Sequence, residues 1–293
     1  MRSHSDSRSV FICVNLWFSF FNSKFKIQNS KLLFHTSLFL FLFISIASFA
    51  DEPSLKNQQE ALEHYKTAVE LHYKGDIVSA IEEYKNAILL DPNVAVYHAD
   101  LGEAYWETYR LLGIHHRDAI EELLTAIRLE PNNETIANAY TTLGVIYDYD
   151  NLLIKAIEYH RKAIKINPHN FYAMNNLGQV YDQLGLVEAA IDNYKKAIEI
   201  APDFAPAYDN LGTTYLKKGN IDEGIAMIKK AIDLSDRDDS HLGLYYNDLG
   251  AAYMINDDLQ QARQCFQKAL EILPDNPDIK KNLDFLENRM KGG

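Results

Sequence analysis

Few side chains in this sequence have the types and spacing that catalysis or metal binding requires. The 293 residues contain no phosphate-binding glycine-rich loop, no nucleophile elbow and no Cys/His set at zinc spacing. His115 and His116 are adjacent, so their side chains do not converge on one ion. Asp236, Asp238 and Ser240 have the spacing that opens a calcium loop, but the required glycine and glutamate do not follow. We therefore expect no enzyme activity, no metal and no cofactor.

A row of short hydrogen-bonding side chains is the feature most suited to binding. In five places such a residue stands directly before a Leu-Gly pair: Asp100, Thr142, Asn176, Asn210 and Asp248. An asparagine amide both donates and accepts, so one side chain can bond a peptide N–H and a peptide C=O together. The alternative is that these side chains only cap or hydrate their own helices.

The elements that must position this row are repeated along the chain. Six copies of one unit begin at Ala61, Ala95, Ala137, Phe171, Ala205 and Gly243. The eighth residue of each copy is small: Ala68, Gly102, Gly144, Gly178, Gly212 and Gly250. Five copies end at a proline: Pro92, Pro131, Pro168, Pro202 and Pro274. Apolar residues at i, i+3, i+4 and i+7 predict two amphipathic helices in each copy.

On this period of about 34 residues, with its small, aromatic and proline positions, the chain is identified as a member of the tetratricopeptide repeat (TPR) family. The resemblance implies an all-α fold, an α-solenoid in which helix-turn-helix repeats form a right-handed superhelix with a C-terminal capping helix. Repeats of this kind stack because one unit alone cannot bury its apolar face.

The expected domain organisation follows from the copies. Residues 1–50 form a signal peptide or N-terminal anchor, and residues 51–60 lead into the first helix. The six repeats span residues 61–94, 95–133, 137–170, 171–204, 205–238 and 243–276. Residues 277–293 form the capping helix and tail. The second repeat is too long, and we place its inserted turn at Tyr109–His116.

In TPR proteins the first helix of each repeat lines a concave groove, which binds a peptide segment. The residues that the resemblance places in this peptide-binding groove are Tyr65, Tyr73, Asp100, Trp106, Thr142, Asn176, Gln179, Asn210, Thr213 and Asp248. Asn176 and Asn210 resemble two rungs of the asparagine ladder in the TPR domain of O-linked N-acetylglucosamine transferase, although Thr142 and the aspartates interrupt the run. Trp106 and the nearby tyrosines are candidates for an apolar anchor, since aromatic residues dominate binding hot spots. Their alternative role is core packing.

The first fifty residues have the layout of an export signal. Leu38–Phe49 is apolar, follows several lysines and ends in Ser48-Phe49-Ala50, a small-residue cleavage pattern. This predicts export to a periplasm or lumen, or secretion; the alternative is a membrane anchor over residues 32–49. Asn22-Ser23-Lys24 recurs at residues 29–31, which indicates that translation begins near residue 31 and that the upstream part is a gene-model artefact.

The net charge of −12 makes nucleic acid an unsuitable partner, because that binding depends on clustered Lys and Arg. The sequence therefore predicts a non-catalytic, exported TPR adaptor or assembly factor that binds a protein or peptide segment. One alternative is a structural scaffold that self-associates as a homo-oligomer. Others are a membrane-tethered accessory subunit of an envelope complex, held only by an uncleaved N-terminal segment, and a glycan-binding protein that uses Trp106 and the tyrosines.

Overall fold

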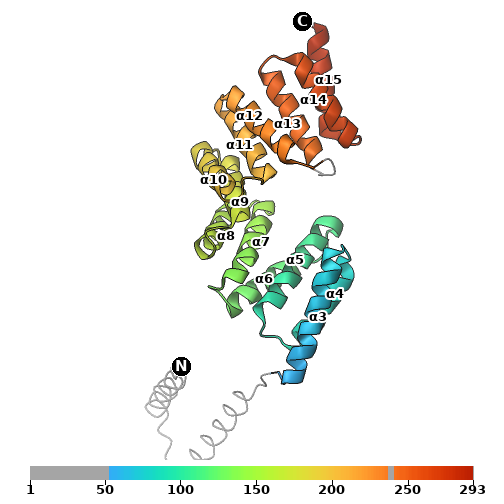
Figure 1. The fold of residues 1–293 in the computed structure, drawn as a ribbon, viewed down its shortest axis with the longest axis vertical. Coiled ribbons are helices and arrows are strands. Elements are labelled where there is room, and N and C mark those ends of the chain that lie inside the picture. The colour runs from blue at the N-terminus through green and yellow to red at the C-terminus, as the bar shows by residue number, and fades with distance from the viewer. Residues whose placement is uncertain (1–52, 237–240, 293) are drawn as a thin grey trace, which may run out of the picture. The chain divides into compact units, whose positions relative to one another are not determined.

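The computed structural model describes residues 53–236 and 241–292 (Figure 1). The expected signal peptide or anchor within residues 1–50 lies outside this part, as do Asp238 and Ser240. The chain divides into two units, Met1–Gln58 and Gln59–Gly293, and the repeats belong to the second. Among the helices of the described residues, none combines the length and the hydrophobicity needed to cross a bilayer.

Helices follow one another in pairs along the described residues, and this part of the chain contains no β-strand. The first helices of the repeats are α3 (Leu55–Tyr73), α5 (Ala95–Leu112), α7 (Ala137–Tyr149), α9 (Phe171–Gln183), α11 (Ala205–Lys218) and α13 (Leu242–Ile255). The second helices are α4 (Ile77–Leu90), α6 (His116–Leu129), α8 (Leu153–Ile166), α10 (Val187–Ile200), α12 (Ile221–Leu234) and α14 (Leu259–Ile272). A short 3₁₀ turn, η1 (Glu134–Ile136), precedes α7, and α15 (Pro277–Gly292) ends the array. The predicted all-α repeat fold is thereby confirmed.

The small eighth residue of each repeat lets its two helices approach closely. A Cβ atom added at Gly178 would lie 2.6 Å from Cε1 of Tyr194, and one at Gly250 would lie 2.7 Å from Cε1 of Phe266. The large side chains that meet these small residues occupy one register of the second helices. They are Tyr84, Leu123, His160, Tyr194, Ile228 and Phe266, all 0–1% exposed. Each repeat therefore closes around one small and one large residue.

The turn of the second repeat is shorter than the sequence suggested. Helix α5 continues through Tyr109 to Leu112, because no residue before Gly113 breaks it. Gly113 then ends the helix in the left-handed region (φ 74°), and α6 begins at His116. The extra residues of this repeat therefore mostly lengthen a helix, and the turn itself is confined to residues 113–115.

The C-terminal helix α15 closes the apolar end of the stack, as predicted. Ile279 and Leu286 are buried, while Leu283 and Met290 pack against the core formed with α13 and α14. Charged side chains such as Lys280 and Lys281 remain exposed. An apolar inner side and a charged outer side are what a terminal repeat cap requires.

Candidate functional site

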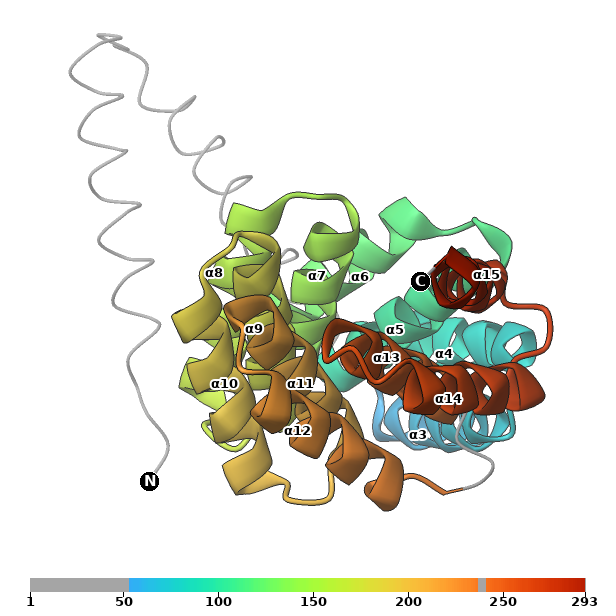
Figure 2. The ribbon, with the colours of Figure 1, turned by 90° about the horizontal axis from the view of Figure 1, so that it is seen from above.

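The first helices form the inner side of the repeat array. In Figure 2, α7, α9 and α11 lie inside α8, α10 and α12, and successive first helices contact one another. We call the surface made by the first helices the inner face. All of the predicted site residues lie on these helices: Tyr65 and Tyr73 on α3, Asp100 and Trp106 on α5, Thr142 on α7, Asn176 and Gln179 on α9, Asn210 and Thr213 on α11, and Asp248 on α13.

One row of hydrogen bonds joins the fifth residue of a repeat to the sixth residue of the next. The Tyr65 hydroxyl donates to Asp100 Oδ2 over 2.8 Å. Further along, Asn210 Nδ2 donates to Asn175 Oδ1 over 2.9 Å. The same register recurs at the C-terminal end, where Asn282 of α15 donates to Asn247 Oδ1 over 2.9 Å. Three of the predicted site residues, Tyr65, Asp100 and Asn210, thus hold neighbouring repeats together.

A second row joins the twelfth residue of a repeat to the thirteenth of the next. The members of this row differ in chemistry but keep the register. They are His72 Nε2 with Glu107 Oε2 (3.2 Å), the Trp106 and Tyr149 rings (5.5 Å between centroids), Gln183 Nε2 donating to Asp148 Oδ1 (3.0 Å), Lys217 with Asp182, and Arg289 Nη1 donating to the Met254 carbonyl (3.0 Å). The inner face is therefore bounded by two lines of inter-repeat contacts.

Three side chains of the inner face form few hydrogen bonds within the chain: Asn176, at the sixth position of its repeat, and Gln179 and Thr213, at the ninth position between the two rows. Asn176 is half-buried and receives only a 3.4 Å contact from the Asn175 amide. Thr213 is half-buried and donates within its own helix to the Asn210 carbonyl. Gln179 is half-buried and makes no side-chain hydrogen bond to any of the described residues. These three amide and hydroxyl groups are the ones that remain suited to a ligand.

Glu103 is an acidic residue in the strip of the inner face between the two rows. It is half-buried on α5 and accepts a 3.3 Å hydrogen bond from Thr142 Oγ1. Burial, together with the neighbouring Asp100 carboxylate, raises the pKa of Glu103 to about 7. The site thus holds an acid that titrates near neutrality.

Two carboxyl groups meet in the first row, at the junction of the fifth and sixth repeats. Asp209 of α11 takes the fifth position and Asp248 of α13 the sixth, where other repeats place a donor opposite an acceptor. Asp209 is 8% exposed, and its Oδ1 has no hydrogen-bond partner in the described residues. Burial and the Asp248 carboxyl raise the pKa of Asp209 far above its usual range, so the pair retains a proton. Asp209 shares the fifth position of its repeat with Tyr65, Asn175 and Asn247, which places it in the same row.

The aromatic side chains divide into buried and exposed members. Trp106 is 6% exposed, stacks on Tyr109 with ring centroids 5.5 Å apart, and meets the Tyr149 ring edge-on. Its burial favours the packing role over that of an accessible anchor. Tyr149 and Tyr73 are 65% and 94% exposed, so they are available at the ends of α7 and α3.

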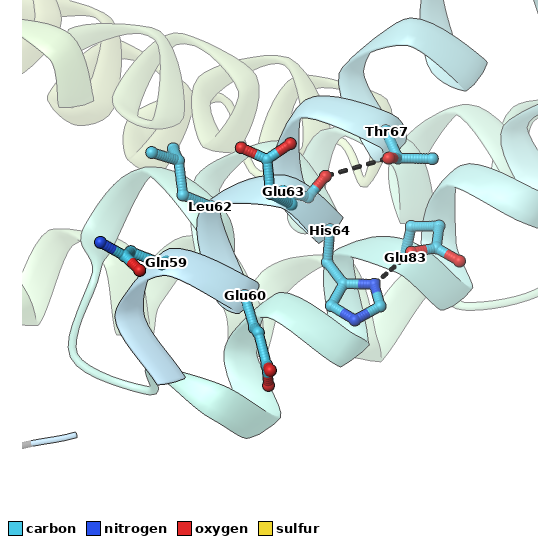
Figure 3. Close-up of a pocket in the computed structure, with 7 residues that line it drawn as sticks. All are labelled: Gln59, Glu60, Leu62, Glu63, His64, Thr67 and Glu83. Carbon is cyan, nitrogen blue, oxygen red and sulfur yellow. Dashed lines mark hydrogen bonds and ion pairs between the residues drawn. The ribbon is translucent and has the colours of Figure 1, made fainter. Parts of the chain in front are cut away.

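A separate hollow of about 730 Å³ lies beside α3 and contains none of the predicted residues (Figure 3). Its wall combines apolar and acidic side chains, and His64 Nδ1 lies 2.6 Å from Glu83 Oε2. The other lining residues are Gln59, Glu60, Leu62, Glu63 and Thr67. Within the described residues, no group of three or more His, Cys, Asp or Glu side chains is arranged to hold a metal ion.

Comparison with known proteins agrees with the repeat architecture. Family models described as tetratricopeptide repeat match residues 137–170, 171–204 and 203–275, and one described as TPR repeat matches residues 70–108. Together they cover more than half of the chain. No curated protein matches the sequence.

Solved structures with TM-scores of 0.50 and above show the same fold. The chain is 31% identical to MamA over 60% of its own length and 92% of that chain, with a TM-score of 0.48. It is similar to the APC/C hetero-tetramer Cut9–Hcn1 (18% identity, 84% of this chain and 45% of that chain, TM-score 0.69). It is also similar to YrrB, a TPR protein with an unusual peptide-binding site (18% identity, 72% and 98%, TM-score 0.50). The chain belongs to the tetratricopeptide repeat family.

Proposed function

We propose that this protein is a non-catalytic adaptor or assembly factor that binds an extended segment of a partner protein along its inner face. The observation that carries the proposal is the strip between the two rows of inter-repeat contacts. The rows stand seven residues apart on each first helix, a rise of about 10 Å. One extended peptide that runs along the strip fits within this width.

The chemistry of the strip suits a peptide backbone. Asn176 and Gln179 each offer a donor and an acceptor, and Thr213 adds a hydroxyl group. All three are half-buried, so a bound segment would be partly withdrawn from water while its polar groups stay paired. The peptide-binding site of YrrB, a protein of the same fold, supports this assignment by analogy.

We also propose that the protein is exported, on the basis of the apolar sequence Leu38–Phe49. We propose that the adaptor acts beyond a membrane, in a periplasm, a lumen or the extracellular medium. Retention by residues 32–49 would make it a membrane-tethered subunit with the same binding face.

A peptide-display selection on the purified full-length protein tests the binding function. Selected extended peptides are then titrated against the wild type and against an Asn176→Ala/Gln179→Ala/Thr213→Ala variant. We expect the triple variant to lose at least about tenfold in affinity, because three backbone-bonding groups are removed. Asp192→Ala/Lys196→Ala/Glu199→Ala, on the exposed side of α10, is the matched control and should bind as the wild type does.

Two results would contradict the proposal. One is the absence of any selected peptide, combined with a molecular mass that rises with protein concentration, which would favour the self-associating scaffold. The other is equal binding by the inner-face variant and the wild type, which would place the site elsewhere on the molecule.

A further inference from the structure

The inner face carries a marked excess of carboxyl groups. The fifth, sixth, ninth, twelfth and thirteenth residues of the six repeats include seven acids but only two lysines. The acids are Asp100, Glu103, Glu107, Asp148, Asp182, Asp209 and Asp248. Both lysines are already paired, Lys66 with Glu63 and Lys217 with Asp182. Uncompensated negative charge therefore remains on this face.

Several of these carboxyl groups are poorly accommodated as anions. Burial is the main cause that raises the pKa values of Asp100, Glu103, Asp148 and Asp248. Asp209 Oδ1 and Asp182 Oδ1 are buried and lack any donor among the described residues. Buried acceptors without donors cost free energy, and a donor supplied by a ligand removes that cost.

The carboxyl groups that lack donors or basic partners lie mainly at two places on the inner face. At the first, Glu103 interacts with the acids Asp100 and Glu107 of its own helix, with Thr142 of α7 and with Tyr84 of α4. At the second, Asp209 faces Asp248 of α13, and Tyr194 of α10 is the other titratable group that interacts with it. Within the described residues, no Lys or Arg side chain pairs with Glu103 or Asp209; at the first place, His72 of α3 lies 3.2 Å from Glu107 and acts on Asp100.

From this charge distribution we infer that the bound segment is basic, an extended stretch whose Lys or Arg side chains pair with Glu103 and with the Asp209–Asp248 pair. The inference rests on the proposed function, since it names the partner chemistry of the same face. Complementary charge selects such a segment, while an acidic segment would meet repulsion along the whole strip.

Binding of a basic segment at these carboxyl groups should change with pH and salt in a way that binding of uncharged or acidic segments would not. At neutral pH the cation replaces a proton held by Glu103 or by the Asp209–Asp248 pair, so complex formation releases protons. The affinity should therefore rise between pH 6 and pH 8. It should also fall with salt, because screening weakens the partly exposed pairs.

Isothermal titration calorimetry on the full-length protein tests the inference with three twelve-residue probes. The probes are a Lys/Ser/Gly peptide, its Glu/Ser/Gly counterpart and an uncharged Asn/Ser/Gly peptide. We expect only the lysine peptide to bind tightly, with proton release measured in buffers of different ionisation enthalpy. Its affinity should drop at least about tenfold in Glu103→Gln/Asp209→Asn. The control Asp192→Asn/Glu199→Gln removes two exposed carboxylates from α10 and should change little.

The variant preserves the fold by design. An asparagine at position 209 can donate from the fifth position to Asp248 at the sixth, as the Tyr65 hydroxyl at the fifth position donates to Asp100. Binding of the uncharged or acidic probe as tightly as the basic one would overturn the inference and leave the proposed function standing. Binding of the basic probe that Glu103→Gln/Asp209→Asn leaves unchanged would also overturn it. Failure of every probe, together with an empty display selection, would reject the proposed function itself.

Discussion

His160 is the polar member of a register otherwise filled by apolar and tyrosine side chains. It is fully buried against Gly144, and neither ring nitrogen has a hydrogen-bond partner in the described residues. Burial lowers the pKa of His160 from its usual 6.5 to about 4. The neutral ring is therefore required by the folded state, and acidification must either charge it in place or unfold the repeat.

A His160→Phe variant should remove this sensitivity, because Phe266 fills the same register opposite Gly250. The depressed pKa gives stability that is complete above pH 6.5 and is lost as the pH falls toward 4, by roughly 3 kcal/mol. Urea unfolding of the variant at pH 7 and pH 4.5 should show a smaller acid loss than the wild type. His169→Phe, at an exposed position, is the control. Equal acid losses in the His160 variant and the wild type would show that another group controls the acid sensitivity.

Gly178 lies where α9 and α10 pack closely, so a larger side chain at this position would clash. Its added Cβ would lie 2.6 Å from the buried Tyr194 ring, a distance that requires the two helices to shift. Gly178→Ala should cost about 1–3 kcal/mol and Gly178→Leu more, as overpacking of a close contact does. Thermal unfolding measures both, with Gln179→Ala as the neighbouring surface control. An unchanged melting temperature in Gly178→Leu would mean that α9 and α10 do not pack in this register.

Contacts between neighbouring first helices give different roles to Asn176 and Asn210, which occupy the same position in their repeats. Asn210 bonds to Asn175, which is 4% exposed, whereas Asn176 has only a long contact. Asn210→Ala should therefore destabilise the protein by about 1–2 kcal/mol, and Asn176→Ala by less than about 0.5 kcal/mol. Urea denaturation of the two single variants gives the comparison directly. Equal losses would contradict the assignment of Asn210 to the inter-repeat row.

The junction of α11 and α13 should respond to pH in the opposite direction from His160. Because the pKa of Asp209 is raised in the folded state, its contribution is favourable at low pH and is lost as the pH rises from about 4 through the raised value. Asp209→Asn should remove this loss and stabilise the protein at pH 8 by at least about 1 kcal/mol, since the amide donates to Asp248. Unfolding free energies at pH 5 and pH 8 test this. A variant that is less stable at pH 8 would show that the ionised pair is tolerated.

Across the whole molecule, the repeat spacing was enough to predict the fold. The period, the small eighth residues and the prolines specify helix pairs and their stacking, because these features act through local geometry. The turn of the second repeat was predicted too long, since the helix-forming residues from Tyr109 to Leu112 extend α5 until Gly113 stops it. Helix ends are the features that local patterns determine least.

The sequence predicts on which helices the expected groove residues lie, but not how these residues bond. The first helices carry every residue expected on the inner face. Sequence alone does not reveal that Asp100 and Asn210 face partners in adjacent repeats, because the bonds join residues about 35 positions apart. It also does not show that Trp106 is buried or that Asp209 meets Asp248. These features depend on how neighbouring repeats rotate against each other, which is a tertiary property.

Hydrogen–deuterium exchange of the protein with and without its best selected peptide tests the central claim most directly. If an extended segment binds the inner face, the added protection should concentrate in α5, α7, α9 and α11, with little change in α6, α8, α10 and α12. Protection confined to the second helices, or to the turn around Gly113, would contradict the account and place the binding surface outside the two rows of inter-repeat contacts.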